Sequence, residues 1–330
     1  MPVDFSTPAY LISFYHISGT ISFFLNTFTI WLVIFKSDKI DNFRYFLLAF
    51  QTLCTMTDFH VTFIVAPCPL HPIIAGFSEG FLTNVWLHYL MVVLVILIVF
   101  QLECLVFCFL RKHQTIAGIM SRHVLPTKCL AVIIAYSCLF PCTCSLFYFN
   151  GVVPREQSLD YAREHYPEYL TSFMSLENFA IYELNIWIKC LAVTSTCTSA
   201  FNTFLFGYTT MDMLRMLKAA QSKVSAASYK RHKTAVKSLL AQFATSSICM
   251  APPTFFIIVA VSDVQNAQVI IQILAAILTL HSPANAMVLV ATTPPYRSFV
   301  FRKNAKMVTV VTSMSGDTSK VGPSRLGRTL

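Results

Sequence analysis

Long apolar runs separated by short polar segments make up most of the chain. The clearest run extends from Gly80 to Leu102, which is 23 residues without an Asp, Glu, Lys or Arg. At about 1.5 Å per residue, a helix of this length measures about 34 Å and can cross a hydrocarbon core of about 30 Å. The pattern therefore predicts a transmembrane helix in this part of the chain.

Six further apolar runs predict an all-α fold, a bundle of seven transmembrane helices. Asp58 is the one charged residue of the second run, and the sixth run contains Pro252 and Pro253, which we expect to kink it. The expected spans cover residues 10–35, 45–65, 84–109, 129–149, 186–211, 238–261 and 268–291. They form one domain, residues 1–297, and residues 298–330 are expected to be a disordered cytoplasmic tail.

Lysine and arginine are distributed unevenly between the connections. Of the 24, 21 follow spans one, three, five and seven, whereas the long connection 150–185 has two and is acidic. Because short cytoplasmic segments collect Lys and Arg, this predicts an amino terminus outside and a carboxyl terminus in the cytoplasm. The inner bases are also expected to attract anionic membrane lipids.

Composition agrees with a membrane protein and argues against other classes. The chain is 55% hydrophobic and 12% charged, and so has too few polar residues to cover a water-soluble domain of 330 residues. The net charge is +9, but the basic residues lie in the segments between apolar runs and do not form a basic face on a soluble domain. We therefore expect no nucleic-acid partner. No nucleophile motif, phosphate-binding glycine loop or i, i+4 histidine pair is present. We therefore expect that the protein is not an enzyme and that it binds no metal and no cofactor.

Short motifs at the ends of the runs resemble one family. They are Lys39-Ile40-Asp41-Asn42-Phe43-Arg44, Asp58-Phe59-His60, Cys68-Pro69-Leu70-His71-Pro72, Arg111-Lys112-His113-Gln114, His281-Ser282-Pro283 and Pro295-Tyr296-Arg297. In this order the chain from about Ser6 to Arg297 resembles the nematode serpentine chemoreceptors of class I, relatives of class H. The resemblance implies a G-protein-coupled receptor of olfaction in the plasma membrane of sensory-neuron cilia. It would bind a small environmental molecule and carry out signal transduction through a heterotrimeric G protein.

An alternative function is a transporter or ion-channel subunit. Transporters built from repeats have two matching halves and pairs of broken helices in corresponding positions. Seven unequal runs without such halves weigh against this alternative.

Candidate ligand contacts are the polar and aromatic residues within the spans or near their outer ends. We expect them to be Asp58, His88, Lys189, Phe255 and His281. A carboxylate inside a membrane is costly, so Asp58 should face the bundle interior. There it either contacts a ligand or ion, or acts as a two-state switch, or it bonds an Asn or Ser, such as Asn285, and fixes packing. Lys189 either reaches a ligand or extends to the interface.

Candidate residues for G-protein coupling are the bases at the inner ends. They are Arg111, Lys112, His113, Arg215, Lys218 and Arg297. The segment from Asp212 to Lys218 is amphipathic and is expected to extend the fifth helix into the cytoplasm, where a partner helix can bind. Attraction of lipid head groups is the other interpretation of these bases.

A third group combines switch and packing residues with the cysteines. Glu103, Pro252, Pro253 and Asn285 are expected to act in switching or packing, with Glu103 either pairing with a base such as Arg215 or sitting protonated among the helices. Cys68 is a candidate for an outer disulfide with Cys142 or Cys144. The other cysteines lie mostly within spans, where small apolar packing is the default.

Overall fold

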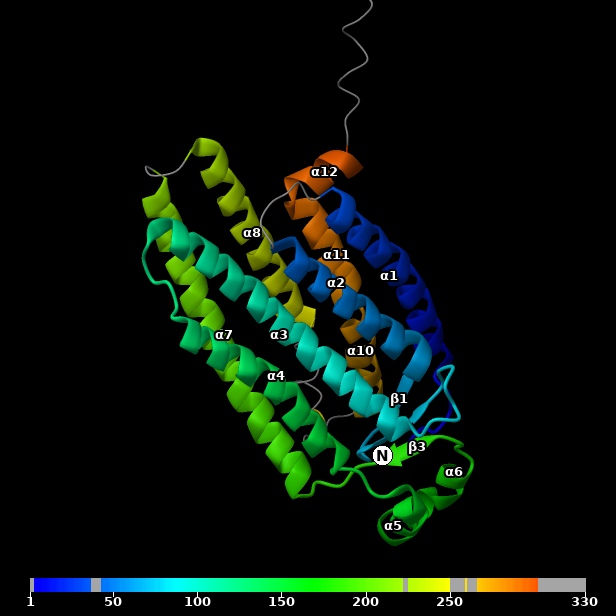
Figure 1. The fold of residues 1–330 in the computed structure, drawn as a ribbon. Coiled ribbons are helices and arrows are strands. Elements are labelled where there is room, and N and C mark those ends of the chain that lie inside the picture. Colours follow the sequence, from blue (N-terminus) through cyan, green and yellow to red (C-terminus); the bar gives the residue numbers. More distant parts are fainter. Residues whose placement is uncertain (1–2, 37–42, 222–224, 250–258, 260–265, 302–330) are drawn as a thin grey trace, which may run out of the picture.

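The computed structural model describes residues 3–36, 43–221, 225–249, 259 and 266–301 (Figure 1). Phe255, Pro252 and Pro253 lie outside these residues, as do the expected kink of the sixth span and most of the tail.

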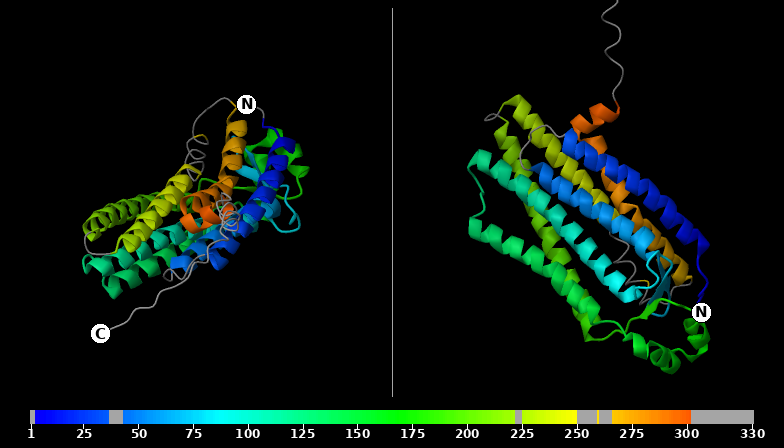
Figure 2. Two further views of the ribbon diagram at one scale, coloured as in Figure 1. Left: turned by 90° about the horizontal axis from the view of Figure 1, so that it is seen from above. Right: turned by 45° about the vertical axis from the view of Figure 1, so that its right-hand side comes forward.

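The described chain is a bundle of long helices (Figures 1 and 2). They are α1 (Ala9–Phe35), α2 (Phe43–Phe59), α3 (Leu87–Met120), α4 (Thr127–Phe149), α7 (Ile186–Ala220), α8 (Ala226–Cys249), α10 (Ala267–Thr279) and α11 (His281–Thr292). A π-helical turn, η1 (His60–Val65), continues α2, and α10 and α11 follow each other as two parts of the seventh span. The short α12 (Pro294–Val300) ends the described chain.

Length and composition fit these helices to a bilayer. Within the described residues, five segments are long and apolar enough to cross a membrane: Ala9–Phe35, Phe43–Val65, Leu87–Met120, Thr127–Phe149 and Ala267–Thr292. Many large apolar side chains on the outside of the bundle are exposed, among them Phe24, Val132, Leu139 and Phe204. Exposed apolar side chains of this kind are suited to lipid, because a helix facing hydrocarbon needs no polar face.

A folded cap covers one end of the bundle, here called the sheet end (Figure 2). It contains an antiparallel sheet of β1 (Pro67–Leu70), β2 (Ala75–Ser78) and β3 (Phe179–Ile181), in the order β1-β2-β3. Between α4 and β3 the chain forms the helices η2 (Arg155–Gln157), α5 (Ser158–His165), η3 (Pro167–Tyr169) and α6 (Leu170–Met174). These elements bury their own apolar cluster, which includes Val3, Leu70, Phe77, Phe173 and Ile181.

Asn178 fastens the cap to the start of α3. Its side-chain Oδ1 accepts a hydrogen bond from the Leu87 backbone N at 2.7 Å, and its Nδ2 donates to the Val85 carbonyl at 2.8 Å. The indole nitrogen of Trp86 donates to the Phe179 carbonyl at 3.0 Å. The first N–H groups of a helix need such partners, so the α3 terminus and the cap stabilise each other.

At the opposite end, here called the loop end, α3 and α7 are longer than the expected spans. α3 continues to Met120 and α7 to Ala220, where 109 and 211 were expected. In the added part of α7, Asp212, Met213, Met216 and Leu217 are buried while Leu214, Arg215 and Lys218 are exposed. This alternation is the amphipathic extension that the sequence predicts.

Candidate functional site

A polar network in the middle of the bundle is centred on Asn26 of α1. Asn26 Nδ2 donates to Ser22 Oγ at 2.9 Å and to Ser282 Oγ at 2.6 Å. Gln51 Nε2 of α2 donates to Asn26 Oδ1 at 2.6 Å. All these side chains are at most 1% exposed. The network therefore joins α1, α2 and α11 by hydrogen bonds between buried side chains, and such bonds hold helices together within a membrane.

Asp58 belongs to this network and faces the bundle interior, as expected. It is 5% exposed, and Ser22 donates a hydrogen bond to its Oδ2. Its partner is thus a serine of α1 and not Asn285. The carboxylate is placed among helices that must keep it hydrogen-bonded, because an unpaired charge inside a membrane is costly.

His281 is the centre of a second buried network. Its Nδ1 lies 2.6 Å from Gln101 Nε2 of α3, and its Nε2 lies 3.0 Å from Ser246 Oγ of α8. Asn285 Nδ2 lies 2.8 Å from the same Nε2 and donates to Ser246 Oγ at 3.1 Å. Because His281 and Ser282 are neighbours at the start of α11, the two networks meet there. His281 and Asn285 are therefore both interior polar residues at the junction of α3, α8 and α11.

Glu103 of α3 bonds to the fifth span and not to a loop-end base. Asn202 Nδ2 of α7 donates to Glu103 Oε1 at 2.7 Å, and Arg215 is exposed three helical turns farther along α7. Of the two alternatives for Glu103, the pairing with Arg215 is not formed in the structure. In the part of the chain that the structure describes, Glu103 Oε2 has no hydrogen-bond partner although it is buried.

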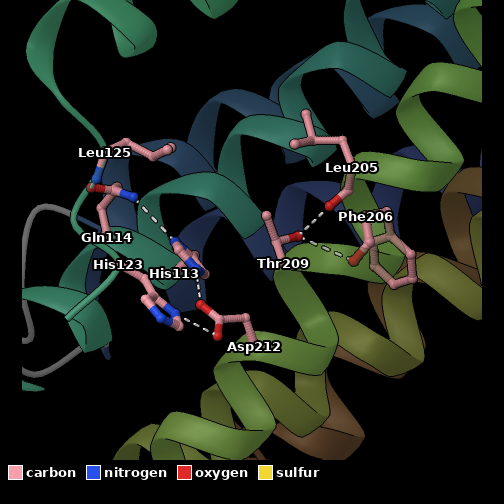
Figure 3. A network of polar contacts seen from close by, with 8 residues as sticks. All are labelled: His113, Gln114, His123, Leu125, Leu205, Phe206, Thr209 and Asp212. Atoms are coloured by element: carbon pink, nitrogen blue, oxygen red, sulfur yellow. Dashed lines mark hydrogen bonds and ion pairs between the residues drawn. The ribbon is translucent and has the colours of Figure 1, made fainter.

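A third network lies at the loop end and joins α3, α7 and the turn between α3 and α4 (Figure 3). The Asp212 carboxylate of α7 accepts a hydrogen bond from His113 Nε2 at 2.8 Å through Oδ2 and one from His123 Nδ1 at 2.8 Å through Oδ1. Gln114 Nε2 lies 3.1 Å from His113 Nδ1, and Gln114 Oε1 accepts from the Leu125 backbone N at 3.0 Å. We call Asp212, His113, His123 and Gln114 the loop-end latch.

Backbone geometry and burial explain why the latch forms. α3 ends at Ser121 in the left-handed conformation, and His123 is also left-handed with φ of 57°, a conformation in which histidine is enriched. This tight turn brings the His123 ring back to α7. The His113 side chain is 2% exposed and that of Asp212 is 9% exposed, whereas that of His123 is 57% exposed. The latch therefore has a buried side on α3 and a side open to solvent on the turn.

An aromatic cluster lies farther along α7 from the latch, toward the middle of the bundle. Phe206 of α7 packs edge-on against Phe109 of α3, with ring centroids 4.4 Å apart, and stacks on Phe243 of α8 at 3.3 Å. Thr209, between Phe206 and Asp212, bonds back to the Leu205 carbonyl of its own helix at 2.8 Å (Figure 3). Three helices thus meet at one place, where separating their ends breaks both apolar and polar contacts.

The structure divides the predicted coupling residues into two sets. Arg111, Arg215, Lys218 and Arg297 are exposed, whereas Lys112 and His113 are 2% exposed. Lys112 Nζ lies 5.3 Å from the centre of the Phe43 ring. The exposed bases can meet a partner or lipid, while Lys112 and His113 act inside the protein.

The two outer ligand candidates differ in their surroundings. His88 is 1% exposed and lies among Trp86, Tyr148, Phe149 and Tyr182, with ring centroids 5.0 to 5.8 Å away. Its Nε2 lies 3.2 Å from the Phe149 carbonyl. Lys189 is exposed in the first turn of α7. His88 therefore fills its own aromatic pocket, and Lys189 lies on the outside of the bundle.

The predicted disulfide of Cys68 with Cys142 or Cys144 is not formed in the structure, where all three are free thiols. The hairpin of β1 and β2 turns Cys68 into the apolar cluster of the cap, with its Sγ 3.8 Å from the Ala66 carbonyl. Cys144 Sγ lies 3.9 Å from Ser195 Oγ of α7, and Cys142 is exposed on α4.

Several network residues escaped the sequence interpretation. They are Ser22, Asn26, Gln51, Gln101, His123, Ser246 and Ser282, together with the role of Asp212. Most of them are uncharged polar residues in an apolar run. Such residues must find partners between helices, so the sequence could have indicated their interior position. The sequence did not indicate that His123 would contact Asp212, because its position depends on the turn after α3.

The comparisons with known proteins agree with this architecture. The sequence matches the family described as "Serpentine type 7TM GPCR chemoreceptor Sri" over residues 1–300. Among solved structures, "Crystal structure of squid rhodopsin" is similar with a TM-score of 0.55 and 11% sequence identity, covering 89% of this chain and 85% of that chain. A search of curated proteins finds no match.

At 11% identity, the likeness to squid rhodopsin shows the fold alone, which is that of a seven-transmembrane G-protein-coupled receptor. The resemblance to serpentine chemoreceptors is confirmed by the family match, and the chain is a multi-pass membrane protein with a receptor fold. The chain belongs to the Sri family of serpentine seven-transmembrane chemoreceptors.

Proposed function

We propose that this protein is a chemosensory receptor of the plasma membrane, in sensory-neuron cilia, that binds a small environmental molecule and activates a heterotrimeric G protein. The family and fold support the receptor class. The charge asymmetry supports a sheet end that faces outward and a loop end in the cytoplasm. The observation that carries the signalling proposal is the loop-end latch, which joins three separate segments at the end where the exposed bases lie.

The proposed mechanism is a shift between a closed and an open bundle. In the closed state Asp212 holds His113 and His123, and Phe206 holds Phe109 and Phe243. A ligand that binds the open state more tightly shifts the population toward it, because its differential affinity is the only source of the signal. The opened ends of α3, α7 and α8 then offer a groove for a partner helix beside Arg215 and Lys218.

The first prediction concerns Asp212→Asn. Asparagine keeps the shape of the side chain but removes the charge that both histidines bond. We expect the closed state to lose roughly 1–3 kcal/mol. Because about 1.4 kcal/mol is a factor of ten in population, the ratio of open to closed receptor without ligand should rise about 5- to 150-fold, and basal signalling should rise with it. The measurement is basal output of a promiscuous G protein with a calcium reporter, at matched surface expression.

His123→Ala should raise basal output in the same direction and less strongly, because it removes one of the two bonds to Asp212. His165→Ala is the matched control, since His165 is an exposed histidine of the cap that stacks on Tyr161. Unchanged basal output in both latch variants, at normal surface expression, would show that the latch does not hold a closed state. Ligand-evoked ion flux in cells without G protein would instead favour the channel alternative.

A further inference from the structure

A surface cavity of about 280 Å³ lies between the amino-terminal segment and α10 at the sheet end. Its polar lining includes Asp4, Ser6, Tyr10 and Gln272, and its apolar lining includes Pro8 and Val269. Ligand pockets usually measure roughly 300–1,000 Å³, so this cavity suits a molecule smaller than a typical drug.

The cavity is built by a strap that ties the amino terminus to α10. The Asp4 backbone N donates to Gln268 Oε1 at 3.0 Å, and Gln268 Nε2 donates to the Asp4 carbonyl at 2.7 Å. The two neighbours of Asp4 in the sequence pack into the cap: Val3 is buried there, and the Phe5 ring lies 5.0 Å from the Phe173 ring. These contacts fix the backbone around Asp4, so its carboxylate stands at a defined place on the cavity wall.

Asp4 presents a negative charge to the cavity. Its Oδ1 accepts a hydrogen bond from the Ser6 backbone N at 2.9 Å. Hydrogen bonds from the side chain and backbone of Ser6 lower the pKa of Asp4 below its ordinary value, so the group is ionised at neutral pH. Within the described residues, Asp4 forms no ion pair.

Gln272 presents a donor to the same cavity. Its side chain is 6% exposed, and its Oε1 accepts a hydrogen bond from the Tyr10 hydroxyl. This orients the amide, because the oxygen is occupied and the Nε2 is left to donate. Because Gln272 lines the cavity, this amide nitrogen is a donor that an acceptor on a ligand could bond.

We propose that this cavity binds a small organic amine, with its ammonium group on the Asp4 carboxylate and a neighbouring acceptor or ring edge toward Gln272. The apolar skeleton then lies against Pro8 and Val269. Six acidic residues in the connection 150–185 place negative charge at the same end of the molecule, and such a field raises the local concentration of cations. The inference rests on the proposed function, because it names the ligand class of the outward-facing end.

The position of the cavity connects it to the interior networks. Gln268 and Gln272 lie on α10, which ends at Thr279, directly before His281. Thr279 Oγ1 lies 3.3 Å from Ser18 Oγ of α1. A ligand that draws Asp4, Tyr10 and α10 together therefore acts on the outer part of the seventh span, and His281 and Asn285 lie on α11, the inner part of that span.

The experiment measures binding directly, without signalling. The full-length receptor in lipid nanodiscs is titrated with butylamine and with 2-phenylethylamine, followed by saturation-transfer difference NMR. The alcohols of the same skeletons, butan-1-ol and 2-phenylethanol, are the matched ligands without a charge. Asp4→Asn is the test variant, since asparagine can still accept the Ser6 bond. Asp160→Asn is the control, because it removes an exposed carboxylate of the cap outside the cavity.

We expect at least one amine to bind the wild-type protein at least tenfold more tightly than its alcohol, and Asp4→Asn to lose that difference while Asp160→Asn keeps it. Equal binding of amine and alcohol, binding of neither amine, or unchanged binding to Asp4→Asn would overturn the proposal. Amine binding that depends on Asp4 but evokes no signal would leave the cavity standing and contradict the receptor function. Higher basal output of Asp212→Asn, together with no amine binding, would support the receptor function and overturn the amine site.

Discussion

Asn26 joins three helices by hydrogen bonds in the middle of the bundle. It bonds to Ser22 on its own helix, to Gln51 on α2 and to Ser282 on α11. An apolar replacement leaves the Gln51 amide and the Ser282 hydroxyl without this partner in the interior of the bundle. Groups left unsatisfied in this way cost more than the bond itself is worth.

We therefore predict that Asn26→Ala lowers the stability of the bundle by roughly 1–3 kcal/mol. The measurement is the thermal unfolding midpoint of the purified protein in detergent. Thr20→Ala is the control on the same helix, because among the described residues the Thr20 hydroxyl bonds only to the His16 carbonyl of α1 at 2.7 Å. An equal midpoint shift in the two variants would mean that Asn26 does not join the helices.

Cys68 provides a second prediction at this scale. Burial, with the charge of Glu79 as a smaller cause, raises the pKa of the Cys68 thiol to about 12, and the thiolate is the form that reacts. We expect Cys68 to stay reduced and to resist alkylation at pH 7.5 in the folded protein, whereas the exposed Cys129 is modified. Peptide mass spectrometry after labelling gives the answer. A Cys68 peptide linked to Cys142 or Cys144 would contradict the structure and restore the disulfide.

At this scale the sequence predicts which residues are interior but not their partners. Asp58, His281 and Asn285 are polar residues in apolar runs, and each lies inside. Their partners depend on how the helices are rotated against each other, which spacing along one helix does not define. Glu103 illustrates the difficulty, because a base such as Arg215 was one candidate partner and Asn202 is the residue that the packing supplies.

At the scale of elements, α1 packs closely against η1. A methyl group added at Gly19 would overlap the side chains of Thr62 and Phe63. Thr62 is fully buried and its hydroxyl donates to the Asp58 carbonyl at 2.7 Å, so it has little room to move. α1 can therefore approach the π-helical turn closely only because residue 19 has no side chain.

We predict that Gly19→Ala destabilises the protein by roughly 1–3 kcal/mol through overpacking. Gly118→Ala is the matched control, since Gly118 lies in α3 with nothing within 4 Å of an added Cβ, and alanine there should be neutral or stabilising. Thermal unfolding of both variants under one condition measures the difference. A Gly19→Ala protein as stable as the wild type would show that the two helices are not in such close contact.

The helices could be foreseen and the cap could not. Apolar runs identify transmembrane helices because every backbone group in lipid must be bonded within the segment. The connections 66–80 and 150–185 contain prolines and acidic residues, and nothing in their spacing predicts that Ala75–Ser78 pairs with both Pro67–Leu70 and Phe179–Ile181. That sheet depends on contacts between distant parts of the chain.

The bundle as a whole has different chemistry at its two ends. The sheet end carries the cap, the strap and the acidic connection, while the loop end carries the latch and most of the exposed bases. The interior networks lie between them and meet on α11. A ligand at one end and a partner at the other can influence each other only if both act on one shared equilibrium of the bundle.

This arrangement depends on which end faces the outside of the cell, and the most direct measurement is the accessibility of the two chain ends. An epitope tag before Met1 and another after Leu330 are probed with antibodies in intact and in permeabilised cells. The account predicts that the first tag is labelled in intact cells and the second only after permeabilisation. Labelling of both tags from the same side would contradict an odd number of crossings, and the receptor mechanism with it.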